Sequence, residues 1–182
     1  TVAFELDPLD PAVQSSLRNA GGGNATLPAA LGEQLARQIE RACIPVQALA
    51  GLHPMMQAMT AVMMDAARDG LHVGYGQEIV LAGFAKARQL RTVSLETPQR
   101  QLAALIPTDP AQAERYLAST LEQLHSGLGR QVLLRMAAAW ERGDLSEIEN
   151  YERWCDCVKT ADDRAMLVAL NDERNPAMAE RI

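Results

Sequence analysis

Apolar side chains recur every three or four residues over most of this chain, which is the spacing of one face of an α-helix. Leu27, Leu31, Leu35 and Ile39 show it most clearly. The pattern predicts a series of helices over residues 11–20, 27–39, 54–68, 77–90, 98–106, 110–126, 130–142, 146–157 and from 162 onward. Glycines at positions 21–23, followed by an asparagine, predict a break after the first helix.

Short polar residues mark where several of these helices begin. Thr97 and Asp109 each precede a proline, a combination typical of a helix cap followed by the first helical position. Ser146 and Glu149 have the spacing of a capping box, so we expect a helix to open there. Pro176 predicts a kink or a new start within the last helical segment.

Two short segments, at about 1–6 and 91–96, follow a different pattern. Thr1-Val2-Ala3-Phe4-Glu5 and Thr92-Val93-Ser94-Leu95-Glu96 match in residue type at every position. We expect neighbouring parallel strands, which would bring Glu5 and Glu96 together at the carboxyl edge of a sheet, where open α/β sheets bind ligands. The alternative is that each glutamate begins a turn and faces water. Two strands alone rarely form a stable sheet, so further strands are expected from flanking residues or another chain.

Composition narrows the class of protein. With 182 residues, 48% apolar residues and only 4% aromatic residues, the chain suits one domain with a helical core rather than a sheet sandwich. The expected fold class is therefore α+β, predominantly helical. A net charge of −6 without a Lys/Arg cluster argues against a nucleic-acid partner. No uncharged apolar run reaches 18 residues, so no membrane span is expected.

The cysteines and methionines leave alternatives open. Cys43 could bridge Cys155 or Cys157, and the Cys-x-Cys pair could be half of a metal site, although no second Cys pair or His-x-His completes it. The three histidines stand alone, without ligand spacing. The methionine-rich face between Met55 and Met64 suits a core, or an adaptable contact surface that would favour a homodimer.

Five short motifs, in order along the chain, resemble one family. They are Glu5-Leu6-Asp7, Gly76-Gln77-Glu78, Leu95-Glu96-Thr97 with Gln101-Leu102, Trp140 with Gly143-Asp144-Leu145, and Arg174-Asn175. The resemblance is to the TraB/GumN family, which includes the Tiki proteins that cleave Wnt. That family also carries two G-x-x-H motifs, which this chain lacks; the Gly-Leu-His sequences ending at His53 and His72 are one residue too short. The chain is therefore interpreted as the central segment, residues 1–182, of a larger domain.

The resemblance implies a metal-dependent hydrolase, more narrowly a peptidase, with the carboxylate and Arg/Asn part of its site in this segment. Glu5 and Glu96 are the candidate catalytic residues and ligands of a divalent metal. Arg174 is the candidate that holds a substrate carboxylate or oxyanion, or it could instead pair with Asp172 or Glu173 on the surface.

Three further residues are candidates for substrate binding. Gln101 could reach back toward the strand edge or make a structural hydrogen bond. Glu78 could reach the site or only complement its helix dipole. Asn175 could reach the substrate, although capping the next helix is favoured. Trp140 and Asp144 are expected to be structural, as a buried indole and a cap.

The resulting hypothesis is a peptide or protein hydrolase, inactive as this segment alone and located outside the cytoplasm, as exported relatives suggest. The rival hypothesis is a non-catalytic helical module for binding or signalling. A third hypothesis is haem or small-ligand binding.

Overall fold

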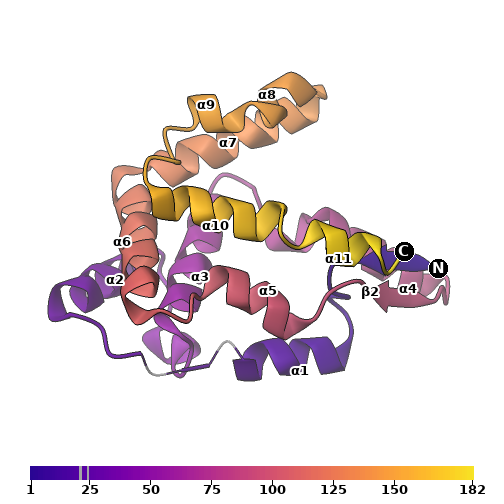
Figure 1. Cartoon of the computed structure of the whole chain (residues 1–182), viewed down its shortest axis with the longest axis horizontal. Helices are drawn as coiled ribbons and strands as arrows, with labels where there is room; N and C mark the ends of the chain where they lie inside the picture. Colours follow the sequence, from indigo (N-terminus) through magenta and orange to yellow (C-terminus); the bar gives the residue numbers. More distant parts are fainter. Residues whose placement is uncertain (21, 24) are drawn as a thin grey trace.

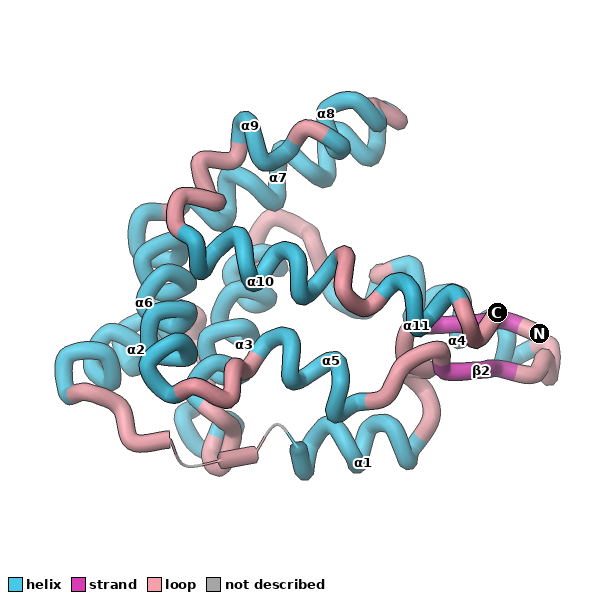
Figure 2. Tube along the Cα trace, viewed as in Figure 1, coloured by secondary structure: helices cyan, strands magenta, loops and turns pink. Residues whose placement is uncertain are grey.

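The computed structural model describes residues 1–20, 22–23 and 25–182, and it is mostly helical (Figure 1, Figure 2). Two residues of the predicted break at 21–24 lie outside the described residues. The strands are β1 (Val2–Phe4) and β2 (Thr92–Ser94). The helices are α1 (Pro11–Ala20), α2 (Ala29–Arg41), η1 (Val46–Leu49), α3 (Pro54–Ala67), η2 (Val73–Tyr75), α4 (Gln77–Ala87), α5 (Pro98–Leu105), α6 (Pro110–Ser126), α7 (Leu128–Arg142), α8 (Leu145–Glu149), α9 (Tyr151–Trp154), α10 (Ala161–Asn171) and α11 (Asn175–Ala179). The predicted α+β class, dominated by helix, is confirmed.

The two strands pair in parallel, as the repeated sequence pattern predicts, but they are shorter than predicted. Their register is also offset by one residue from the sequence match, because Val2 lies opposite Thr92 rather than Val93. Beyond the strands, the backbone N–H of Glu96 donates to the carbonyl of Glu5 at 2.9 Å. The two glutamates therefore do leave the sheet at the same edge.

The main core lies away from the sheet, where α2, α3 and α6 pack together. Leu35 and Ile39 of α2 meet Met55 of α3 and Leu117 and Leu121 of α6, all of them nearly inaccessible to solvent. Helix α10 packs against both α5 and α6 and leads into α11 at the strand end (Figure 1). This packing fixes the direction from which the last residues approach the sheet edge.

Several local predictions are confirmed and two are wrong. The side chains of Thr97 and Asp109 cap α5 and α6 by accepting hydrogen bonds from backbone N–H groups. The expected cap at Asp144 is also confirmed, since its side chain accepts from Glu147 N at 3.1 Å and starts α8. The expected capping box at Ser146 therefore does not form. The predicted helix over 146–157 is instead two short helices, α8 and α9, separated at Asn150.

The prediction of a buried Trp140 is also wrong, since this residue is 72% exposed on α7. The partly buried indole is Trp154, whose Nε1 donates to the carbonyl of Glu147 at 2.9 Å. The guanidinium of Arg135 lies 4.0 Å from the centre of its ring. The methionine face divides in two, because Met55 is buried whereas Met63 and Met64 are exposed.

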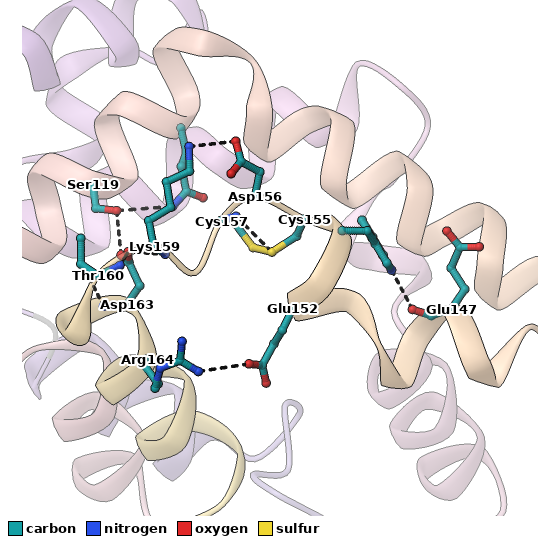
Figure 3. Close-up of a disulfide and its surroundings, with 12 residues drawn as sticks. Ser119, Glu147, Glu152, Cys155, Asp156, Cys157, Lys159, Thr160, Asp163 and Arg164 are labelled. Carbon is teal, nitrogen blue, oxygen red and sulfur yellow. Dashed lines mark hydrogen bonds and ion pairs between the residues drawn. A yellow bond between two sulfur atoms is a disulfide. The ribbon is translucent and has the colours of Figure 1, made fainter.

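Cys155 and Cys157 form a disulfide with each other, and Cys43 is a free, exposed thiol. The alternative of a Cys43 bridge is therefore wrong. Figure 3 shows the disulfide at the connection between α9 and α10. Beside it, Asp163 completes the capping box of α10 with Thr160 and accepts a hydrogen bond from Ser119 of α6 at 3.0 Å. None of the described helices is long and apolar enough to cross a membrane.

Candidate active site at the strand edge

The candidate site forms where the two strands end, and its two glutamates differ in exposure. Glu96 follows β2 and its side chain is only 1% exposed, whereas the side chain of Glu5, after β1, is 45% exposed. Burial of an ionised carboxylate is costly unless a cation and hydrogen bonds compensate for the lost water. Glu96 therefore needs a charged partner, and Glu5 can remain partly hydrated.

Arg174 supplies that partner from the connection between α10 and α11. Its Nε donates to Glu96 Oε1 at 3.0 Å, and its Nη2 donates to Glu5 Oε2. The guanidinium is itself buried, so it lies between the two carboxylates out of contact with bulk water. The surface pairing of Arg174 with Asp172 or Glu173, considered from the sequence, is wrong.

One oxygen of the site is left without a partner. Glu96 Oε2 is buried and accepts no hydrogen bond from the residues that the structure describes. Buried polar atoms nearly always have a partner, and an exception often marks a functional group. This oxygen is free to accept a proton or to contact a cation.

Gln101 and Glu78 both lie beside Glu5. Gln101, in α5, places its Nε2 3.5 Å from Glu5 Oε2. Glu78 belongs to the first turn of α4, which packs on β1. Loss of water around its carboxyl raises the pKa of Glu78, and the charge of Glu5 raises it further, while the Glu5 backbone and Arg174 act in the opposite direction. Glu78 therefore lies close enough to Glu5 and Arg174 to feel their charges.

Asn175 does not cap the next helix as expected. Helix α11 begins at Asn175 itself, and its cap is Arg174, whose side chain makes no capping hydrogen bond. Arg174 instead reaches the two glutamates. Asn175 is exposed next to it, so its predicted part in substrate binding stays a prediction.

Two arginines that sequence reasoning missed lie at the same place. Arg100 and Arg181 line a cavity of about 140 Å³ together with Glu96 and Arg174. The signal was present in the spacing, because Arg100 comes four residues after Glu96 and Arg181 seven after Arg174. Within a helix, intervals of four and seven residues return to one face, although Glu96 lies just before α5 and Arg181 just after α11.

The site meets only part of what a metal requires. Across residues 1–20, 22–23 and 25–182, no three His, Cys, Asp or Glu side chains are grouped so as to hold a metal ion. Glu96 Oε2 would suit a divalent cation as an unpartnered oxygen donor, and Glu5 is the second carboxylate. Of the histidines, His53 caps α3 by accepting from Met55 N at 3.2 Å, a structural role.

Comparison with known proteins identifies a family. The TraB/PrgY/gumN family matches residues 1–182, the whole chain. No curated protein and no solved structure matches the chain.

Proposed function

The chain belongs to the TraB/PrgY/gumN family, and we propose that it forms the carboxylate and arginine part of the active site of a metal-dependent peptide hydrolase. The observation that carries this proposal is the buried, unpartnered Oε2 of Glu96 beside a buried guanidinium. An anionic oxygen held in a fixed position by a cation is suited to general-base chemistry.

In the proposed reaction, Glu96 Oε2 takes a proton from a water molecule as the water oxygen attacks the carbonyl carbon of a peptide bond. The same carboxyl then gives that proton to the leaving nitrogen when the C–N bond breaks. Glu5 accepts a hydrogen bond from Nη2 of the guanidinium, and Gln101 in turn donates to the Glu5 carboxylate. Atoms and charge balance without an additional reactant.

Arg174 stabilises the oxyanion that forms on the attacked carbonyl. An arginine has five N–H donors, and the bonds to Glu96 and Glu5 engage two of them. The remaining donors can face a developing negative charge. Because the guanidinium is already fixed by two carboxylates, little reorganisation is needed during the reaction.

A bound divalent metal would polarise the carbonyl and lower the pKa of the attacking water. Glu5, with Glu96 beside it, would hold the metal. Further ligands, such as imidazoles, would have to come from outside the described residues. An extracytoplasmic location belongs to the same proposal, and the Cys155–Cys157 disulfide supports it because such bonds persist in oxidising compartments.

The test is cleavage of a quenched-fluorescent peptide library by the protein, expressed with any residues that flank it in its gene, with and without added Zn²⁺ or Mn²⁺. We expect metal-stimulated cleavage that Glu96→Gln lowers by about 100-fold or more. Glu33→Gln, at an exposed glutamate of α2, is the matched control and should leave the rate unchanged. Equal cleavage by the Glu96→Gln variant and the wild type would refute the assignment.

The rival function, a non-catalytic binding module, has one observation in its favour. Tyr75, Val80 and Phe84, in η2 and α4, are apolar or aromatic residues that are each more than half exposed. Such side chains are typical of contact surfaces. This hypothesis predicts no cleavage in any metal condition, and partner binding that changes with Phe84→Ser but not with Glu96→Gln.

A further inference from the structure

The cavity beside the candidate site is positively charged, in a protein whose net charge is −6. Its charged lining consists of Arg100, Arg174 and Arg181 against a single carboxylate, that of Glu96. The volume is about 140 Å³, so the cavity admits a small group rather than a chain that passes through. The imbalance of charge favours an anion as its occupant.

The three arginines differ in the hydrogen bonds and ion pairs that they already make. Arg174 is used by the two buried glutamates. Arg100 is half exposed, lies 3.9 Å from Glu96 Oε1 and donates to the carbonyl of Glu173 at 3.2 Å. Arg181 has no ion pair within the described part of the chain, so its charge and part of that of Arg100 are available to a ligand.

The positions of these groups follow from two short segments that face each other. In and around α11, Arg174, Ala177, Met178 and Arg181 fall on one helical face and line the cavity. Across from them, Glu96 and Arg100 belong to the start of α5 and the residues just before it. Glu96, the residue with the unpartnered oxygen, and the available cations therefore line the same small cavity.

We propose that this cavity is a subsite for the terminal carboxylate of a peptide, bound by Arg100 and Arg181. This inference rests on the proposed hydrolase and names its substrate class: peptides with a free carboxyl terminus, cleaved at their last bond. In the last residue of a peptide, the backbone nitrogen and the carboxylate are both attached to the same α-carbon. A carboxylate bound by the arginines would therefore bring that nitrogen into the small cavity that Glu96, the proposed proton donor, also lines.

The test measures binding rather than cleavage, with acetyl-Ala-Ala as the free acid and as the carboxyl amide, by isothermal titration calorimetry on the full chain. We expect the acid to bind about tenfold more tightly than the amide, a preference that weakens at high salt. Arg100→Gln and Arg181→Gln should each remove most of this preference, and the double variant all of it. Arg37→Gln, at an exposed arginine of α2, is the matched control and should keep the preference.

Each other outcome has a definite meaning. Equal affinity for acid and amide, or a preference that survives in the double variant, overturns the subsite. Tighter binding of inorganic phosphate than of the free acid overturns it in favour of a phosphate site. Cleavage of acid and amide at equal rates overturns the subsite but leaves the hydrolase. Selective binding of the acid, without any cleavage by the protein expressed with the residues that flank it in its gene, keeps the subsite and refutes the hydrolase.

Discussion

Replacing Arg174 by methionine gives the sharpest test of how the strand edge is held together. Methionine keeps much of the apolar stem of the side chain but removes the cation that both glutamates contact. Glu96, with a side chain that is 1% exposed, is then left as a buried charge without compensation. The effect on the free energy of unfolding therefore depends mainly on Glu96 and only weakly on Glu5.

The expected magnitude follows from the two exposures. Breaking a buried ion pair by removing one partner costs about 3–5 kcal/mol. The contact with Glu5, which is 45% exposed, contributes below about 1 kcal/mol because water screens it. For a chain of this length, the loss corresponds to a decrease in Tm of about 6–20 °C. Glu5→Gln alone should lower Tm by no more than about 2–4 °C.

The assay is urea denaturation and thermal melting followed by circular dichroism, on four proteins: the wild type, R174M, E96Q and the double variant. If the cost of R174M is the uncompensated carboxylate, the double variant should recover a large part of the lost stability, because neither charge remains. Strictly additive losses in the double variant, or a loss below about 1 kcal/mol in R174M, would refute this electrostatic explanation.

Three other predictions follow from local features. The pKa of Glu78 is raised in the folded protein, so its ionisation opposes folding as the pH rises through that pKa. E78Q should therefore raise Tm slightly at pH 7 and give no gain near pH 3. The Cys155–Cys157 disulfide closes a very short loop, so dithiothreitol should lower stability by about 1.5 kcal/mol in the wild type and not in C155S/C157S; an equal effect on both would contradict this. W140F should remove most of the fluorescence that iodide quenches, because the Trp154 ring is covered by Arg135; unchanged quenching would show that Trp154 is the accessible indole.

The sequence predicted the helices and the meeting of the two glutamates because both depend on local patterns. Helical periodicity indicates which face of a segment is buried, and the sequence similarity before Glu5 and Glu96 indicates two strands of one type. The structure confirms that both leave the same edge of the sheet. The offset in register was not predictable, because sequence similarity between strands does not determine which residues lie opposite each other.

The wrong predictions concern residues whose environment depends on parts of the chain that are far away in sequence. Arg174 has acidic neighbours in sequence, and only the path of α10 shows that it contacts Glu5 and Glu96 instead. Trp140 lies near the end of a helix, but it is 72% exposed. At the start of α8, Asp144 and Ser146 were both suitable caps. The helix begins directly after Gly143 and Asp144, so Asp144 is the residue that caps it.

Arg174 bonds to Glu96 and Glu5, which lie 78 and 169 residues before it in the sequence. This separation has a consequence while the protein is being synthesised. As the chain leaves the ribosome, Glu5 and Glu96 are exposed long before the residue that neutralises them exists. Contacts of such large sequence separation form late, because closing the intervening loop costs entropy. The site is thus completed after the helical core, and a nascent chain that ends before position 174 carries the acidic pair in an unassembled state.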